Sequence, residues 1–222
     1  MRDEASRRFR LIVFDWDGTL SDSTTIIADA IRDACRDVGV PVPDEAAARY
    51  VIGLGLTDAL RSVAPSLPVH RYPELSAHYR RHYLAREDDI PLFPGAADML
   101  GELDAAGYLL GVATGKSRAG LDRVLVRNGL TRRFHATRCA DEGHPKPHPD
   151  MLVALMDRLG VEREHTLMIG DTTHDLELAR NAGVAGVAVA YGAHAPEGLG
   201  RLAPLSTVHS VAELRAWLAA NG

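Results

Sequence analysis

From residue 89 onward the sequence alternates between short apolar runs and segments with helical periodicity, and this alternation restricts the fold more than any other feature. The apolar runs lie at 108–113, 134–139, 166–170 and 184–189, and helical patterns separate them. A chain built in this way forms a parallel sheet whose two faces are covered by helices. The pattern therefore predicts an α/β domain with a Rossmann-like parallel sheet.

A run rich in β-branched and aromatic residues near the N-terminus, residues 9–14, predicts one more buried parallel strand. It ends in two carboxylates, Asp15 and Asp17, which are followed by Gly18. Side chains two residues apart on a strand point to the same side, so both carboxylates can converge where the strand stops. Gly18 allows a sharp turn and a close approach of the backbone to a ligand. A solvated acidic turn would have the same sequence, so the pair becomes informative only together with other residues.

Residues 22–88 interrupt the alternating pattern with helical segments and no convincing strand. The expected helices begin at Asp22 or Ser23 and end at Val38, and then cover 44–50, 57–64 and a segment with Pro73 in its first turn. An insertion directly after the first strand would stand over the carboxyl ends of the strands, where ligands of such sheets bind. The expected division is a core of 1–21 and 89–222 and a helical cap of 22–88.

Composition excludes several classes of protein. The net charge is −5 and the isoelectric point about 6.0, which does not suggest a nucleic-acid or membrane-surface protein. Residues 1–8 are polar and lack the apolar core of a secretory signal, and no apolar run is long enough to cross a bilayer. Cys35 and Cys139 are too few for a disulfide framework. We therefore expect a cytoplasmic protein that contacts neither nucleic acid nor membrane.

Polar residues follow the predicted strands at the points where they end. Beside Asp15 and Asp17, Thr114 ends the second strand, and Asp171 directly follows the fourth strand, with Asp175 four residues later. The carboxyl ends of parallel strands meet at one edge of the sheet, so these side chains are expected to lie close together.

Lysine is scarce, since only Lys116 and Lys146 are lysines among the 25 basic residues. Arginine-rich coding would explain the bias, but it would leave lysine mainly where a compact point charge is needed. Lys146 lies between prolines, which predict a stiff, extended loop in 143–150. Lys146 is expected to be the central cation of a site, and Lys116 to start a helix at the mouth of that site.

Four segments together resemble the motifs of the haloacid dehalogenase-like hydrolase superfamily: residues 15–20, 114–115, 146–150 and 170–175. Their order and spacing cover nearly the whole chain. The insertion resembles the α-helical cap of the subgroup that contains phosphoglycolate phosphatases. The resemblance implies an Mg²⁺-dependent phosphatase that hydrolyses a small phosphomonoester, 2-phosphoglycolate-like or a sugar phosphate, through an aspartyl-phosphate.

The same resemblance implies a role for each motif residue, and general chemistry agrees with these roles. Asp15 would be the nucleophile and Asp17 the general acid and base. Thr114, Gly115 and Lys146 would bind the phosphate, with Thr114 and Lys146 also counted as catalytic residues. Hard oxygen ligands suit Mg²⁺. The metal ligands would be Asp15, Asp171 and Asp175 with the main-chain oxygen of Asp17.

Alternatives from other functional classes remain open at this point. A phospho-accepting receiver domain also uses acidic residues, a threonine and a lysine at strand ends, but it is about half as long. A phosphomutase of the same superfamily would need a lysine in the cap, and residues 22–88 contain none. The glycines of the 53–55 turn are equally consistent with a cap turn and with a substrate contact. The sequence leaves monomer and homodimer open.

Overall fold

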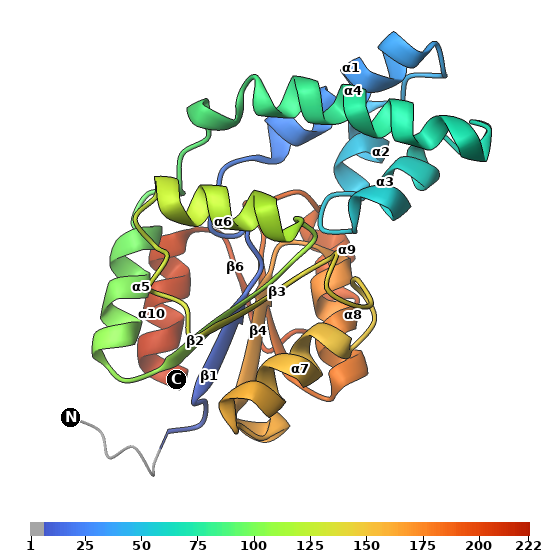
Figure 1. The fold of residues 1–222 in the computed structure, drawn as a ribbon. Helices are drawn as coiled ribbons and strands as arrows, with labels where there is room; N and C mark the ends of the chain where they lie inside the picture. Colours follow the sequence, from blue (N-terminus) through green and yellow to red (C-terminus); the bar gives the residue numbers. More distant parts are fainter. Residues whose placement is uncertain (1–6) are drawn as a thin grey trace.

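The computed structural model describes residues 7–222, so part of the polar segment 1–8 lies outside the described residues. A six-stranded parallel sheet forms its centre, with strand order β3-β2-β1-β4-β5-β6, and helices flank the sheet (Figure 1). This confirms the predicted α/β, Rossmann-like fold class. The strands are β1 (Leu11–Phe14), β2 (Leu109–Thr114), β3 (Ala136–Cys139), β4 (Thr166–Gly170), β5 (Ala185–Val189) and β6 (Thr207–Val208).

Alternating residues of the strands face two separate apolar layers, as the period of a strand requires. On one face Ile12 and Phe14 pack with helices α5 (Ala96–Ala105), α6 (Arg118–Arg127) and α10 (Val211–Asn221). On the other face Leu11 and Val13 pack with α7 (Asp150–Leu159) and α8 (Thr173–Ala182). The strands are buried on both sides, which explains why they appear in the sequence as continuous apolar runs.

The inserted helices form a separate layer above the sheet (Figure 1). They have an apolar cluster of their own, in which Ile31 of α1 packs with Leu75 of α4. The helices are α1 (Thr24–Val38), α2 (Glu45–Tyr50), α3 (Leu56–Val63) and α4 (Tyr72–Leu84). The first three were predicted to within about two residues, and Pro73 lies in the first turn of α4 as expected.

Some elements were not predicted or begin at a different residue. β6 and the short helix α9 (Pro196–Gly200) carry too few residues to show a period, and short 3-10 helices lie at Val69–Arg71, Glu87–Asp89 and Arg163–His165. Helix α8 begins at Thr173, two residues before Asp175, where the helical pattern of the sequence begins. The 143–150 segment is turned rather than extended, because His148 N donates to Pro145 O across a turn.

The sheet order places two strand ends at a special position. β1 pairs with β2 on one side and with β4 on the other. The connections that follow β1 and β4 therefore lead to opposite edges of the sheet. Such a switch of direction opens a crevice at the carboxyl ends of the strands, where ligands bind in open α/β sheets. Asp15 and Asp171 directly follow β1 and β4 at this point. Among residues 7–222, none of the helices is long and apolar enough to cross a membrane.

Candidate active site

Three buried carboxylates meet at the carboxyl edge of the sheet. One oxygen each of Asp15, Asp171 and Asp175 lies within 4.8 Å of the others. The strand register brings the first two together, because Phe14 pairs with Ile169 and Asp15 N donates to Ile169 O. All three side chains are almost completely buried. The residues that the sequence placed at three separate positions therefore form one cluster.

Asp175 reaches this cluster through the first turn of α8. Thr172 caps the helix: its side chain accepts from Asp175 N, while Asp175 Oδ2 accepts from Thr172 N at 3.0 Å and from Thr172 Oγ1 at 2.7 Å. This reciprocal pair is a capping box, which satisfies backbone donors at the start of a helix. The Thr-x-x-Asp spacing therefore sets the orientation of the carboxylate.

Lys146 is the cation of the cluster. Its Nζ lies 2.8 Å from Asp15 Oδ1 and 2.6 Å from Asp175 Oδ1, and its side chain is fully buried. Burial opposes the charge of the ammonium group, but Asp15 and Asp175 outweigh it and raise the pKa of Lys146 above its ordinary value. Lys146 is therefore charged, and the turned loop places its ammonium group between two carboxylates.

One lysine does not neutralise three carboxylates. With all groups ionised, three negative charges and one positive charge leave a net charge of −2 in a buried site. Burial raises the pKa of Asp15 to about 7, although Lys146 lowers it. Burial and then the neighbouring carboxylates Asp15 and Asp175 raise the pKa of Asp171 well above its ordinary value. Two more positive charges would be needed to neutralise the site, and one divalent cation carries that charge.

The oxygen atoms of the cluster fit a hard cation such as Mg²⁺. Asp15 Oδ2 has no partner among the described residues, and Asp15 Oδ1 has only the Lys146 ammonium group at 2.8 Å. Asp171 accepts one donor on each oxygen, Thr19 Oγ1 at 2.8 Å and Ala193 N at 2.7 Å, and keeps lone pairs free. Asp175 is the most occupied, with Lys146 on Oδ1 and two donors on Oδ2. Availability for a metal thus decreases from Asp15 to Asp171 to Asp175.

Gly18 is required by the close packing around Asp171. It has a φ of 81°, in the left-handed region, and a Cβ at this position would lie 2.1 Å from Asp171 Oδ2. The turn after β1 therefore passes directly over the carboxylate of Asp171, the residue that follows β4. This explains why glycine follows the Asp-x-Asp pair.

Asp17 lies outside the carboxylate cluster and has different partners. Its Oδ1 accepts from Ser23 Oγ at 2.7 Å and lies 3.1 Å from Lys116 Nζ. Lys116 also donates to Tyr83 OH at 2.7 Å, and its side chain is 9% exposed. Lys116 is thus a partner of Asp17 inside the site, not a residue at its mouth. Sequence reasoning missed this contact, although the scarcity of lysine was a signal for it.

Thr114 and Gly115 connect the sheet to the cap. Thr114 is buried, and its Oγ1 accepts from Lys116 N at 3.2 Å. A Cβ on Gly115 would lie 2.5 Å from Leu54 O and 2.7 Å from Gly53 O, so only glycine allows the cap turn to approach. The 53–55 turn is therefore a docking contact between cap and core.

Two histidines hold the end of α2 against the core. His174 Nε2 and His194 Nε2 both donate to Tyr50 O, at 2.9 and 3.0 Å. The Tyr50 ring stacks on His194 with centroids 5.0 Å apart and meets His174 edge-on at 5.4 Å. Since His194 Nδ1 accepts from Thr173 N, this ring is a neutral imidazole that donates through Nε2. His174 contributes hydrogen bonding and packing at this contact.

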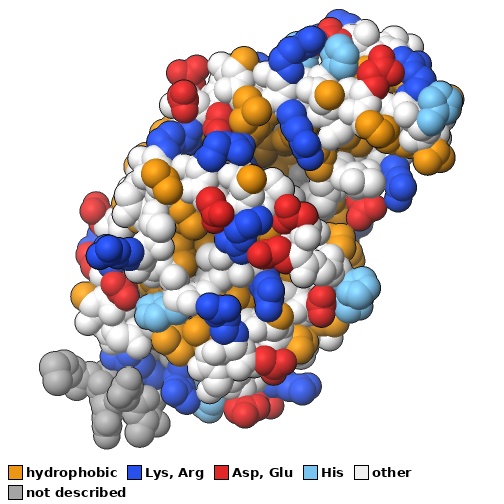
Figure 2. Space-filling view, in the orientation of Figure 1, with side chains coloured by type: hydrophobic (Ala, Val, Ile, Leu, Met, Phe, Trp, Pro, Cys, Tyr) orange, Lys and Arg blue, Asp and Glu red, His pale blue; other side chains and the backbone are white. Residues whose placement is uncertain are grey.

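A cleft of about 700 Å³ separates the cap from the core and has Asp17 and Lys116 among its lining residues. Its cap side carries apolar residues such as Ile27 and Leu54, the tyrosines of α4, and Arg80. Figure 2 shows the surface hollowed between the two parts, with hydrophobic side chains inside the hollow and basic ones near its rim. Tyr79 and Tyr83 pack in the apolar cluster of the inserted helices and also line this cleft.

Comparison with known proteins agrees with this geometry. The family model described as haloacid dehalogenase-like hydrolase matches residues 12–189. The chain is 38% identical over 210 residues to "Probable phosphatase IndB" of Dickeya dadantii, covering 92% of this chain and 91% of the relative. It is 32% identical over 219 residues to the phosphoglycolate phosphatase of Vibrio vulnificus, covering 94% and 95%. A solved hydrolase structure from Pseudomonas syringae superposes with a TM-score of 0.87 at 24% identity, covering 96% and 98%.

These matches favour a hydrolase over the receiver-like switch that the sequence left open. The family match includes the segments that end at Asp15, Thr114, Lys146 and Asp171, which the structure brings to one edge of the sheet. The chain therefore belongs to the haloacid dehalogenase-like hydrolase family, and it is a phosphatase of that family.

Proposed function

We propose that this phosphatase hydrolyses small phosphomonoesters with Mg²⁺ as its cofactor and with a covalent phosphate on Asp15 as the intermediate. The observation that carries the proposal is the buried cluster of Asp15, Asp171, Asp175 and Lys146, whose carboxylates exceed its ammonium charge by two. Among the oxygens of the three carboxylates, Asp15 Oδ2 is the only one without a partner among the described residues, so it keeps its lone pairs for a phosphorus atom or a metal.

The first half-reaction transfers the phosphoryl group to the protein. A carboxylate oxygen of Asp15 forms a bond to phosphorus while the bond from phosphorus to the ester oxygen breaks. Asp17 gives a proton to that ester oxygen, so that the alcohol leaves neutral. An anionic substrate in the cleft offers Lys116 a second partner besides Asp17, which weakens the attraction of this ammonium group for the ionised form of Asp17.

The second half-reaction restores the enzyme. Asp17, now ionised, takes one proton from a water molecule whose oxygen attacks the phosphorus of the aspartyl-phosphate. The bond between phosphorus and Asp15 breaks, and inorganic phosphate leaves with the water oxygen. Lys146 and the Thr114 hydroxyl hold the phosphoryl oxygens, and Lys146 keeps Asp15 oriented at 2.8 Å.

The metal would be held by Asp15 and Asp171, with Asp175 and the main-chain oxygen of Asp17 completing the protein ligands. When bound, Mg²⁺ supplies positive charge that stabilises the developing charge on the phosphoryl oxygens. The relative from Vibrio vulnificus is named a phosphoglycolate phosphatase, which supports a small phosphate ester as the substrate of this chain.

We further propose that residues 22–88 act as a cap that selects the substrate for a core of 1–21 and 89–222. Among the basic residues that line the cleft, Lys116 is paired with Asp17 and Arg123 with Glu87 at 3.1 Å. Arg80 forms no ion pair with any described residue, so it is available for a second anionic group such as the carboxylate of 2-phosphoglycolate.

Phosphate release from a panel of phosphomonoesters, measured with and without a chelator, tests the function. We expect activity that disappears on chelation and returns with Mg²⁺, and Asp15→Asn should lose both turnover and acid-stable labelling by phosphate. Turnover in Asp15→Asn at the wild-type rate would overturn the covalent mechanism, and full activity in excess chelator would overturn the metal.

The role of Arg80 has a matched control on the same helix. Arg80→Gln should raise KM for 2-phosphoglycolate by roughly tenfold and leave uncharged sugar phosphates nearly unchanged. Arg81→Gln should change neither, because Arg81 contacts Asp37 and is absent from the cleft lining. If Arg80→Gln and Arg81→Gln changed KM equally, Arg80 would have no specific role in recognising the substrate.

A further inference from the structure

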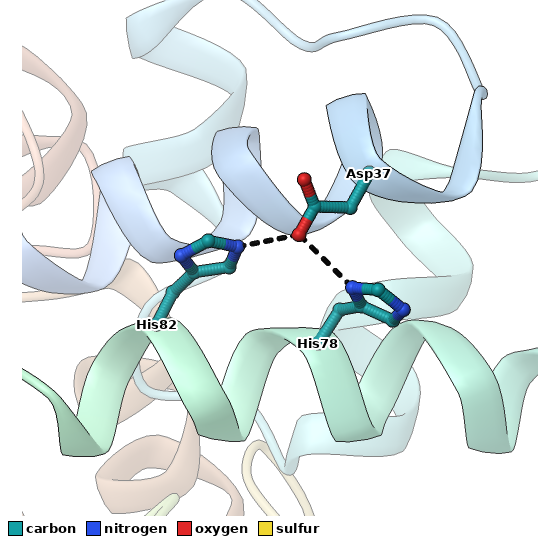
Figure 3. Close-up of side chains that lie close together, drawn as sticks. All are labelled: Asp37, His78 and His82. Atoms are coloured by element: carbon teal, nitrogen blue, oxygen red, sulfur yellow. Dashed lines mark hydrogen bonds and ion pairs between the residues drawn. The ribbon is translucent and has the colours of Figure 1, made fainter.

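Two helices of the cap bring three side chains that bind transition metals to one place, outside the catalytic cluster. Asp37 lies in the last turn of α1, and His78 and His82 lie one turn apart on α4. Residues four apart on a helix share one face, so both imidazoles can point at the same atom. Figure 3 shows the Asp37 carboxylate between the two rings, with one of its oxygens directed at both.

The distances are close to those of a metal site. Asp37 Oδ2 lies 2.9 Å from His78 Nδ1 and 2.6 Å from His82 Nε2, and one ligand atom of each residue lies within 4.8 Å of the others. Two ligand atoms of a tetrahedral zinc ion are about 3.3 Å apart. The cluster would have to open by less than about 1 Å. The three side chains are 26–33% exposed, so this movement meets no packed core.

The donor set selects the class of ion. Two imidazole nitrogens and one carboxylate oxygen suit Zn²⁺ and similar divalent transition metals, whereas Mg²⁺ prefers oxygen ligands and retains its waters. The hydrogen bonds from His82 and His78 hold the pKa of Asp37 below its ordinary value, so its carboxylate is ionised at neutral pH. Three protein ligands leave the fourth tetrahedral position to water.

We propose that Asp37, His78 and His82 bind a Zn²⁺-type ion that ties α1 to α4 in the cap. Both helices also contribute lining residues to the cleft, Ile31 from α1 and Tyr83 from α4. An ion shared by both helices therefore fixes the position of one helix relative to the other on the cap side of the cleft. The proposal concerns the cap alone and does not depend on the reaction proposed for the aspartate cluster.

The guanidinium group of Arg81 lies beside Asp37 and His78 and already supplies positive charge there. Its Nη2 lies 2.5 Å from Asp37 Oδ2 and 3.0 Å from His78 Nδ1. A guanidinium group at this distance competes with a metal ion for the carboxylate and repels it. Arg81→Gln should therefore tighten Zn²⁺ binding by a few-fold, a change that a purely ionic network of side chains would not produce.

A second histidine pair provides a matched control. His144, His148 and Asp150 also cluster, but the two histidines lie on an exposed loop, Asp150 begins α7, and His148 Nδ1 already accepts from Asp150 N at 3.3 Å. His144→Gln combined with His148→Gln removes the same number of imidazoles as His78→Gln combined with His82→Gln. The two double variants thus separate the cap site from histidine content in general.

Zn²⁺ is the probe, added to the whole chain in excess Mg²⁺ so that the aspartate cluster has its preferred ion. Calorimetry gives the stoichiometry and affinity, the visible spectrum of Co²⁺ reports the coordination geometry, and each variant's unfolding temperature is compared with its own value without Zn²⁺. The wild type and the loop variant should bind one ion and unfold at a higher temperature. The His78/His82 variant should bind at least about tenfold more weakly, without that shift.

Several results would overturn the site. The site is wrong if the wild type does not bind Zn²⁺, or if the wild type and the His78/His82 variant bind it with equal affinity. It is also wrong if only the loop variant loses binding. Comparing each variant with its own metal-free state keeps the test valid even where a substitution weakens the cap.

Discussion

At the scale of single residues, the two lysines neutralise different carboxylates of the site. Lys146 lies between Asp15 and Asp175 at the bottom of the site, while Lys116 lies between Asp17 and the tyrosine hydroxyl of the cap. Each lysine thus holds one of the two carboxylates of the Asp-x-Asp pair. Because their partners have different roles, their substitutions should have different consequences.

Lys146→Met should abolish activity and also destabilise the metal-free protein. Breaking a buried ion pair by removing one partner costs about 3–5 kcal/mol, because the remaining charges stay buried without compensation. Mg²⁺ should restore part of this loss, since it neutralises the same carboxylates. Urea unfolding with and without Mg²⁺ measures both effects, and an unchanged stability in the metal-free variant would contradict the ion pair.

Lys116→Met should instead lower kcat by roughly 10- to 100-fold and leave Mg²⁺ affinity close to that of the wild type. The reason is that Lys116 contacts Asp17 and not the carboxylate cluster. Steady-state kinetics on one good substrate at several Mg²⁺ concentrations separates the two quantities. An unchanged kcat would show that Lys116 does not act through Asp17, and that it only starts a helix near the site as the sequence suggested.

The carboxylates Asp171 and Asp175 should differ in their effect on the metal. Asp171→Ala should weaken the apparent Mg²⁺ affinity by at least about 100-fold, and Asp175→Ala by about tenfold, because Asp175 is already occupied by Lys146 and Thr172. Asp175→Ala should also lose about 1 kcal/mol of stability through the cap of α8. Magnesium titrations of activity check the order, and a larger effect of Asp175→Ala would reverse the assignment.

At the scale of structural elements, the cap is docked through backbone contacts as well as side chains. The carbonyl of Tyr50 at the end of α2 accepts from two histidines of the core, and the carbonyls of the 53–55 turn rest against Gly115. Contacts of this kind depend on the path of the backbone. They therefore respond to the size of a neighbouring residue more than to its charge.

Gly115→Ala should reduce kcat/KM by roughly tenfold or more, because its Cβ would lie 2.5 Å from Leu54 O and must displace the cap turn. Gly101→Ala is the control: it lies in α5, a Cβ there meets no atom within 4 Å, and alanine favours a helix. Kinetics of both variants tests the docking contact. Similar activity in the two would show that the turn moves away without loss.

At the scale of the whole molecule, the buried negative charge links metal binding, stability and pH. In the folded protein the pKa of Asp15 is raised to about 7, above its value in the unfolded chain. Between the unfolded and folded pKa values the folded state keeps a proton that the unfolded state releases. The contribution of Asp15 to stability is therefore largest at acidic pH and decreases as the pH rises towards 7.

Mg²⁺ should stabilise the protein more strongly as the pH rises from about 5 to about 8, because the metal binds the ionised carboxylate and competes with the proton. Thermal unfolding with and without Mg²⁺ at several pH values measures this gain. Asp15→Asn should flatten the pH dependence, since one titrating group is removed. A gain that does not change with pH in the wild type would contradict the raised pKa.

The sequence by itself determined the fold class and most of the site. Apolar runs alternating with helical segments are sufficient for a parallel sheet, and residues that follow such strands must gather at one edge. Asp15, Thr114, Asp171 and Asp175 were placed at this edge on this ground, Lys146 was expected from its loop and the scarcity of lysine, and the structure brings Lys146 to Asp15 and Asp175. β6 was missed because two residues carry no period.

Only the tertiary structure decided which group each charged residue contacts. The pairing of Lys116 with Asp17 and Tyr83, and the meeting of Asp37 with two histidines of α4, join residues far apart in the chain. Local patterns predict the face on which a side chain lies, but not which helix is packed against that face. Contacts between cap and core depend on that packing, and therefore the partners of these residues could not be predicted from the sequence.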